Sequence, residues 1–500
     1  MSASETPAQR ALALLNAGRT AEALAAIEPH ARLPGAPHPA LAAYSLALKT
    51  ATRLEEALEV SRRAARDYPA SAAAEHNVAA LLGDLNRPAE AEAAARRALA
   101  KGGDAPETWL TLGRALIEQG RAAEAEAALR EAVRRRPEMA DAHRELAQVV
   151  WMTTGDRDAS AAPLRGAVAA NPRDPALAIQ LAKALQYGGR EDEAYGVLQT
   201  AIRGSNQVNF ALEATAASLA AVRGDPGAAL DHAYRALTER PGDVPVGILA
   251  CDAYLGLGRA EEAAQLAARL HQLAPNEQQV LSRLAVAWRI LGDPRYRVLY
   301  DYARVVRPWR IDTPEGWPDL PSYLADLAAA LKRLHTFTTH PFDQSLRHGS
   351  QTPQNLKTVE EPAVRAFFAA IDGPIRRHMA MLGTGPDPLR SRNTGRYDIA
   401  GIWSVRLRPN GFHIDHVHHE GWLSSACYIE LPPAVEAEGR EGWIKFGEPG
   451  VPTEPPLPPE HFVKPERGML VLFPSYMWHG TVPFSGDATR MTIAFDVVPA

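Results

Sequence analysis

The sequence predicts a multidomain protein: an all-α superhelix of helical repeats, followed by a double-stranded β-helix (jelly-roll) domain with flanking helices. Three observations support this prediction. A short signature recurs about every 34 residues through the first three hundred residues. Beyond that point the composition changes from Ala, Leu, Arg and Glu to Pro, Trp, Phe and His. Short apolar segments separated by Gly and Pro then fill the last hundred residues, as in antiparallel β proteins.

The bulk composition excludes several classes of protein. A chain of 500 residues is too long for one hydrophobic core. Its net charge of −5 gives no reason to expect a nucleic acid or a membrane as partner. The first ten residues lack the pattern of a secretory signal, and no run of about 18 apolar residues predicts a transmembrane helix. Only Cys251 and Cys427 occur, which fits a reducing compartment, so we expect a cytoplasmic protein.

The repeat signature is a Gly-Arg or Gly-Asp pair, or an Arg alone, placed before each new Ala-rich helix start. Successive signatures are 34 or 35 residues apart, at Arg19, Arg53, Arg87, Arg121, Asp156, Arg190, Asp225, Arg259 and Asp293. This period is that of the tetratricopeptide (TPR) repeat, in which each unit is a helix, a tight turn and a second helix. The Gly permits the positive φ that ends the first helix.

One unit resembles the TPR pattern most closely. Its matching residues are Trp109, Leu112, Gly113, Ala125 and Pro137. By this resemblance the array presents a groove to a protein or peptide ligand, because stacked units form a superhelix. The alternative interpretation is a spacer or a dimerisation platform.

We predict three parts along the chain: a TPR array of about nine units over residues 1–307, a Pro- and Gly-rich linker over 308–320, and a jelly-roll domain over 321–500. Helices are expected at about 320–334 and 361–382. The segment 340–356 between them has no clear periodicity and is expected to be an ordered loop. Its polar residues Gln344, Ser345, Arg347 and Gln351 could reach a substrate.

From Ile402 onward the pattern becomes β. Residues 402–407 alternate and are followed by a predicted turn at 409–411 (Pro-Asn-Gly). Further strands are expected at 423–431, 442–446, 469–473 and 490–498. Short strands joined by Gly/Pro turns predict an antiparallel sandwich or jelly roll.

Ten of the sixteen histidines lie between His335 and His479, so potential metal ligands gather in the last third of the chain. A ferrous oxygenase site needs three protein ligands on one face of the metal. His416 and His418 meet part of this need, since residues i and i+2 of a strand point the same way. His479, on a distant strand, is the expected third ligand.

A second pair, His413 and Asp415, is the alternative source of the first two ligands. On a regular strand the two pairs face opposite sides, so only one can face the metal. Spacing alone leaves both pairs open, and the family resemblance described below favours His416 and His418, which lie five residues after Gly411. Asp415 would then accept a hydrogen bond from a ligand imidazole or lie in solvent.

A cosubstrate with a carboxylate tail needs a fixed cation near the metal. Arg490 offers a planar bidentate clamp, and Thr492, two residues on, shares its face of the strand. Tyr428 could hydrogen-bond the same carboxylate, and Lys445 is a weaker rival cation.

Together these motifs resemble the 2-oxoglutarate/Fe(II) oxygenases that are often fused to TPR repeats, and more distantly the prolyl 4-hydroxylases. The matching segments are His416-x-His418, 422–428, 468–474, Trp478-His479 and Arg490-x-Thr492. The resemblance implies Fe(II) and 2-oxoglutarate as cofactor and cosubstrate, with His416, His418, His479 and Arg490 as the catalytic set. It also implies hydroxylation of a protein or peptide recruited by the array. In the family the Arg follows the distal His by about ten residues, and here the step is eleven.

Two other functions remain open. A cupin-type metalloprotein is also a jelly roll with His-x-His and a later His, but the usual cupin Glu is missing because Glu420 comes too early. A non-enzymatic TPR scaffold with a degenerate barrel is the other alternative.

Overall fold

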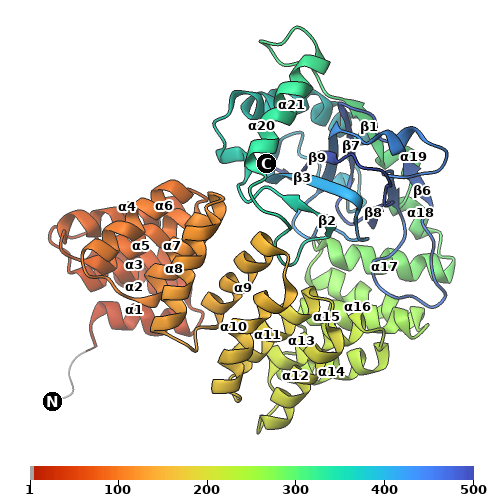
Figure 1. Ribbon diagram of the computed structural model, residues 1–500. Helices are drawn as coiled ribbons and strands as arrows, with labels where there is room; N and C mark the ends of the chain where they lie inside the picture. Colours follow the sequence, from red (N-terminus) through yellow and green to blue (C-terminus); the bar gives the residue numbers. More distant parts are fainter. Residues whose placement is uncertain (1–4) are drawn as a thin grey trace. The chain divides into compact units, whose positions relative to one another are not determined.

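The computed structural model describes residues 5–500 (Figure 1). Residues 1–4 lie outside the described residues. They belong to the first ten residues, in which the sequence predicts no secretory signal. The chain divides at Val149/Val150 into two compact units, here called the N-terminal and C-terminal units. The division falls inside the repeat array, and the boundaries 1–307, 308–320 and 321–500 stay predictions. Within residues 5–500, no helix is both long and apolar enough to cross a membrane.

The N-terminal unit consists of helical hairpins (Figure 1). Its helices are α1 (Pro7–Asn16), α2 (Thr20–Ala31), α3 (His38–Thr50), α4 (Leu54–Asp67), α5 (Ala72–Asp84), α6 (Pro88–Ala100), α7 (Pro106–Glu118) and α8 (Ala122–Arg135). The division between the units lies within α9 (Ala140–Thr154). Consecutive helices pack on one another through small residues such as Ala94, Ala125 and Ala128, which are buried. This is the helical superstructure that the 34-residue period predicts.

The turn within each repeat has the same backbone geometry. The residue before each signature position has a positive φ: Gly18, Thr52, Asn86, Gly120, Gly155, Gly189, Gly224, Gly258 and Gly292, with values between 55° and 75°. Thr52 and Asn86 occupy this left-handed position although they carry a Cβ. The conformation therefore belongs to the repeat itself, and Gly is its least strained occupant.

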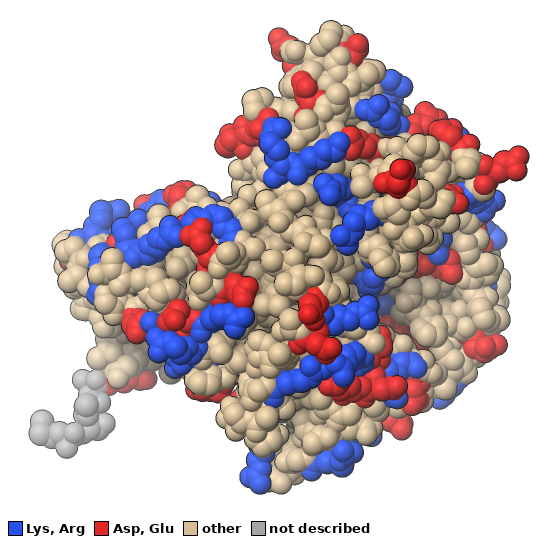
Figure 2. Space-filling view, viewed as in Figure 1, with Lys and Arg blue, Asp and Glu red and all other residues tan. Residues whose placement is uncertain are grey.

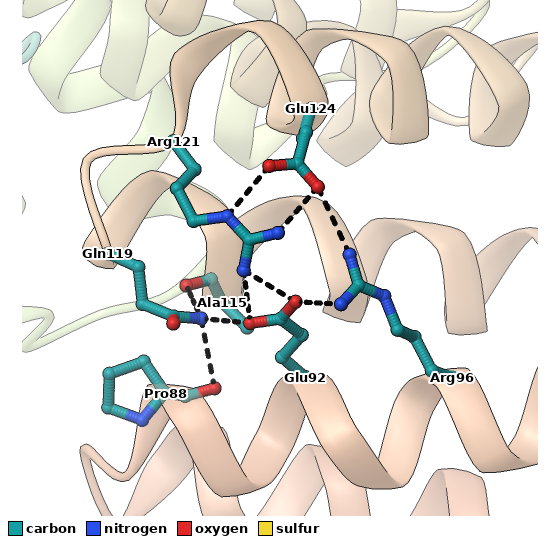
Figure 3. A network of polar contacts seen from close by, with 7 residues as sticks. All are labelled: Pro88, Glu92, Arg96, Ala115, Gln119, Arg121 and Glu124. Atoms are coloured by element: carbon teal, nitrogen blue, oxygen red, sulfur yellow. Dashed lines mark hydrogen bonds and ion pairs between the residues drawn. The ribbon is translucent and has the colours of Figure 1, made fainter.

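Polar groups buried between repeats are satisfied by neighbouring repeats. Glu92 of α6 is 6 % exposed and accepts hydrogen bonds from Arg121 Nη1 at 2.6 and 2.7 Å and from Gln119 Nε2 at 2.7 Å. Arg96 also pairs with it, and Glu124 joins both arginines (Figure 3). A buried carboxylate needs such partners, and here they connect α6 to α8.

Acidic and basic side chains are intermixed over the face of the molecule drawn in Figure 2.

The C-terminal unit continues the hairpins. They are α10 (Arg157–Ala170), α11 (Pro175–Tyr187), α12 (Glu191–Gly204), α13 (Phe210–Val222), α14 (Pro226–Glu239), α15 (Val244–Gly256), α16 (Ala260–Leu273) and α17 (Gln278–Leu291). Two short helices follow, α18 (Arg295–Leu299) and α19 (Tyr302–Val305).

An antiparallel sheet region completes this unit. Its main sheet has six strands in the order β1-β7-β4-β9-β3-β2, and a second sheet has the order β6-β5-β8. The strands are β1 (Arg307–Arg310), β2 (Leu346–Gln351), β3 (Tyr397–His413), β4 (Leu423–Glu430), β5 (Ile444–Phe446), β6 (His461–Val463), β7 (Met469–Pro474), β8 (His479–Thr481) and β9 (Arg490–Pro499). Strand β1 overlaps the start of the expected linker segment, residues 308–320, and pairs with β7.

The two flanking helices are α20 (Leu320–Leu334) and α21 (Pro362–Leu382), close to the expected ranges. Their buried side chains share one hydrophobic core with β4, β7 and β9, where Phe367 meets Phe495 edge to face at 6.3 Å. Because side chains alternate along β9, Phe495 faces the helices while Arg490, Thr492 and Asp496 face the other side.

Two local expectations were wrong. The turn predicted at 409–411 is part of β3, which runs on to His413. The register with β2 shifts there, and Asn410 and His348 both have positive φ, so the extra residues form a bulge. The segment 340–356, expected to be a loop, contains β2, whose polar sequence Leu-Arg-His-Gly-Ser-Gln gave no strand signal. Strand β6 was not predicted either.

Candidate metal and cosubstrate site

Three imidazoles meet between the two sheets. His416 and His418 lie on the extended segment after β3, and His479 begins β8. His416 and His479 exchange backbone hydrogen bonds of 2.9 and 3.1 Å. The ring nitrogens of the three histidines lie within 4.8 Å of one another, and this is the one such group of possible metal ligands in residues 5–500.

In all three rings a hydrogen bond at Nδ1 fixes the orientation of the imidazole. His416 Nδ1 lies 2.8 Å from the Ile414 carbonyl oxygen, and His479 Nδ1 lies 3.0 Å from that of Met477. His418 Nδ1 lies 2.7 Å from Asp496 Oδ1. Carbonyl and carboxylate oxygens only accept, so each Nδ1 carries a hydrogen, and in the neutral ring the Nε2 presents a lone pair.

The Nε2 atoms of His416 and His418 are 3.2 Å apart. Two lone pairs at this distance repel each other unless a proton or a metal ion is shared between them. The donor set therefore suits a metal ion that both nitrogens can bind.

Burial keeps two of the rings neutral. It lowers the pKa of His416 to about 3, helped by the nearby His418, and it lowers the pKa of His479 well below its ordinary value. Burial also opposes a charge on His418, but the adjacent Asp496 carboxylate outweighs burial and raises the pKa of His418. Neutral imidazoles are the form that binds metals.

The alternative pair of ligands has other partners. His413 Nδ1 lies 2.9 Å from Ser345 Oγ, which is also 3.2 Å from His416 Nε2. Lys445 Nζ donates to Asp415 Oδ2 at 2.8 Å and also pairs with Glu448. His413 is therefore close to the three imidazoles, whereas Asp415 is held by the ammonium group of Lys445.

Arg490 is the buried cation of this region. It is 2 % exposed, and neither its Nε nor its Nη1 has a hydrogen-bond partner among residues 5–500. Its guanidinium carbon lies 5.1 Å from the centre of the Tyr428 ring, and the buried Tyr428 hydroxyl is also without a partner. Burial lowers the pKa of Arg490, yet a guanidinium stays charged at any ordinary pH. Unpaired buried donors of this kind call for an anion.

The same strand carries a residue that the sequence analysis missed. Asp496 is 8 % exposed, accepts from His418, and also accepts from Ser424 Oγ at 2.8 Å. Side chains alternate along a strand, so Asp496 lies on the same face of β9 as Arg490 and Thr492. An acidic residue on the cavity-facing side of an apolar strand is the sequence signal that could have identified it.

One cavity of about 1680 Å³ contains these groups. Its wall includes the three histidines with Arg490 and Thr492, and also Gln344, Ser345, Arg347 and Gln351. Repeat helices of the C-terminal unit contribute Trp151, Gln186, Tyr187, Glu191 and Val222. The cavity is therefore bounded both by the sheets and by α9 to α13.

Comparison with known proteins agrees with both parts of the chain. Residues 401–496 match the family model described as "Putative 2OG-Fe(II) oxygenase". Models of the tetratricopeptide repeat match residues 79–132, 110–175 and 223–286. No curated protein matches the chain.

Several solved structures are similar to the chain at low sequence identity. Yeast Tom70 matches with 16 % identity and a TM-score of 0.46, over 57 % of this chain and 61 % of its own. PilF of Pseudomonas aeruginosa matches with 22 % identity and a TM-score of 0.32, over 42 % and 94 %. A tetratricopeptide repeat protein from Parabacteroides merdae matches with 16 % identity and a TM-score of 0.37, over 49 % and 96 %. The chain thus spans about three-fifths of the length of Tom70.

The chain thus combines segments within residues 79–286 that match tetratricopeptide repeat models with a segment, residues 401–496, that matches the model described as "Putative 2OG-Fe(II) oxygenase".

Proposed function

We propose that the protein is a 2-oxoglutarate- and Fe(II)-dependent dioxygenase that hydroxylates a protein or peptide recruited by the TPR array. The observation that carries this proposal is the pairing of two features in one cavity. Three imidazole ring nitrogens lie within 4.8 Å of one another, and a buried guanidinium with unpaired N–H groups lies in the wall of the same cavity. A metal chelator with a distal carboxylate satisfies both features together.

His416, His418 and His479 would hold the iron. When bound, Fe(II) supplies the activation of O2 that couples oxidative decarboxylation of 2-oxoglutarate to hydroxylation of a C–H bond. Three neutral imidazoles offset the metal charge less than a set with a carboxylate. Asp496 compensates in part, since its carboxylate accepts the Nδ1 hydrogen of His418 and makes that ring a stronger donor.

Arg490 would bind the distal carboxylate of 2-oxoglutarate through its planar fork of N–H groups. Thr492 lies on the same face of β9 and offers a hydroxyl, and the unpartnered Tyr428 hydroxyl offers a second donor. The low exposure of these three side chains excludes water, which strengthens the ionic contact. These residues fix the cosubstrate rather than take part in bond breaking.

The six-stranded and three-stranded antiparallel sheets support a jelly-roll assignment for residues 321–500. The proposed organisation also includes the array over 1–307 and a linker over 308–320, where β1 adds a strand to the main sheet. The cavity is larger than a five-carbon diacid needs, and repeat helices form part of its wall. Both features favour a polypeptide segment as the substrate that shares the cavity.

The test is formation of succinate from 2-oxoglutarate by the full-length protein with Fe(II) and O2. His479→Ala is expected to abolish succinate formation, because it removes one of three ligands. His419→Ala is the matched control, since His419 is adjacent to the ligand pair but its side chain is 60 % exposed. Wild-type protein that binds neither iron nor 2-oxoglutarate would refute the proposal.

A cupin-type metalloprotein is the second candidate, and the all-imidazole ligand set is the observation in its favour. It needs no 2-oxoglutarate, so Arg490→Met would leave its metal chemistry unchanged. Under the dioxygenase proposal the same variant loses cosubstrate binding.

A further inference from the structure

The segments that carry the metal-ligand histidines are anchored in the repeat helices. Val417 lies between His416 and His418, and Trp478 precedes His479. Both belong to one hydrophobic cluster with residues of α15, α16 and α17: Tyr254, Leu255, Ala263, Val286 and Ala287. The three histidines line the cavity, Trp478 is buried against the array, and Val417 contacts both.

A buried ion pair of the array lies against Trp478. Arg283 of α17 donates through Nε and Nη2 to the two carboxylate oxygens of Asp252 in α15, at 2.8 and 2.9 Å. Both side chains are at most 7 % exposed. The guanidinium carbon lies 4.8 Å from the centre of the Trp478 ring system. The bidentate pair holds the guanidinium in one plane, and this plane limits where the indole can lie.

The backbone before His479 is held by Tyr300, which follows α18, and by Gly447, which follows β5. The Trp478 N–H donates to the Tyr300 hydroxyl at 3.2 Å, and the Trp478 carbonyl accepts from the Gly447 N–H at 2.9 Å. Arg289 of α17 in turn donates to the Gly447 carbonyl at 2.7 Å. The Trp478 side chain and N–H therefore contact residues of the predicted array. Its carbonyl is bound by Gly447, which Arg289 of α17 holds in turn.

From these contacts we infer that Arg283 is a positioning residue for the metal site, acting through Trp478 on His479. The inference rests on the proposed function, because it assumes that the three imidazoles bind a metal. Tight metal binding requires each ligand nitrogen to be positioned within a fraction of an ångström. Here the side chains that position Trp478, and through it His479, belong to the repeat helices. The last repeats are in this sense part of the oxygenase site and not only a recruiting surface.

The test uses the full-length protein and Co(II) alone, with the dissociation constant and the visible absorption spectrum of bound Co(II) as readouts. Arg283→Met is expected to weaken Co(II) binding about 10- to 100-fold and to change the spectrum, the range typical of residues that orient metal ligands. Arg283→Lys keeps the charge but loses the fork, so it should recover part of the affinity. Arg223→Met is the matched control: Arg223 also pairs with a carboxylate, Asp192 at 2.7 Å, and lies 4.5 Å from an aromatic ring, that of Tyr195.

Arg283→Met leaves Asp252 unpaired and could unfold the protein. The double variant Asp252→Leu/Arg283→Met replaces both members of the buried ion pair by apolar side chains, a change that is often neutral for stability. The same loss of Co(II) affinity is expected for this variant. Wild-type affinity and spectrum in a folded Arg283 variant would overturn the inference, even if its melting temperature fell. Failure of the wild-type protein to bind Co(II) would instead refute the metal site itself.

Discussion

Asp496 gives His418 a different character from the other two imidazoles. His416 and His479 donate to backbone carbonyls, whereas His418 donates to a carboxylate that is itself buried and held by Ser424. A carboxylate behind a ligand imidazole makes the ring more basic and fixes its orientation. Under the proposed function, Asp496 would thereby bring negative charge near the metal without occupying a coordination position.

Asp496→Asn is expected to weaken metal binding by about 10- to 100-fold, because the amide keeps the volume but not the charge. The affinity should also depend on pH. In the wild type, protonation of His418 competes with the metal as pH falls through its raised pKa, while His416 and His479 stay neutral. Loss of the carboxylate lowers the pKa of His418, so the midpoint should move to lower pH in the variant. Co(II) titrations between about pH 5 and 8 measure both effects, and an unchanged midpoint would show that Asp496 does not act on His418.

At the scale of elements, close helix packing in the array depends on particular glycines. A Cβ on Gly247 of α15 would lie 2.7 Å from a methyl carbon of Leu270 in α16, and a Cβ on Gly113 of α7 would lie 2.6 Å from Leu129 in α8. Gly196, inside α12, has open space at the same position. Helix propensity alone favours Ala over Gly by about 1 kcal/mol, so packing decides the sign of each substitution.

Gly247→Ala is expected to destabilise the protein by about 1–2 kcal/mol, because overpacking outweighs the gain in helix propensity. Gly196→Ala should stabilise it by about 0.5–1 kcal/mol. Both sites lie in helices of the C-terminal unit, so thermal unfolding of the full-length protein compares them directly. Shifts of the same sign for both variants would contradict the packing interpretation.

At the scale of the whole molecule, the site and its supports lie within one compact unit. The histidines, Arg490, and the repeat helices that hold Trp478 all follow Val149. Residues 308–500 alone contain every predicted ligand but none of α15 to α17. Comparing fragments that contain or lack these repeat helices therefore tests how much of the array the metal site requires.

A chain of residues 138–500, which keeps α9 whole, is expected to fold and to bind Co(II) with the affinity of the full-length protein. A chain of residues 308–500 should bind it at least about ten times more weakly, because the apolar cluster around Trp478 and Val417 loses its partners. Equal binding by both fragments would show that the sheet region supports the histidines on its own.

Local patterns in the sequence predicted the repeats and the ligand candidates, and long-range contacts account for what they missed. The repeat period and the helices near 320–334 and 361–382 follow from spacing and apolar faces, which are local. The bulge at Asn410 depends on pairing with β2, and β2 itself has no alternating pattern. Asp496 and Arg283 acquire their roles only through contact with His418 and Trp478, 78 and 195 positions away in the sequence. No short window of sequence contains such a relationship.

The central claim is that a buried guanidinium binds the tail of a diacid chelated at three imidazoles. The most direct test is a calorimetric titration of 2-oxoglutarate into the Co(II)-loaded full-length protein, carried out without O2 so that no reaction occurs. Arg490→Met should weaken binding by about 2–4 kcal/mol, or roughly 30- to 1000-fold, since it removes one partner of a buried charge pair. Arg408→Met, at an exposed arginine in the wall of the same cavity, should leave binding unchanged. Equal affinity of the wild type and Arg490→Met for 2-oxoglutarate would contradict the account.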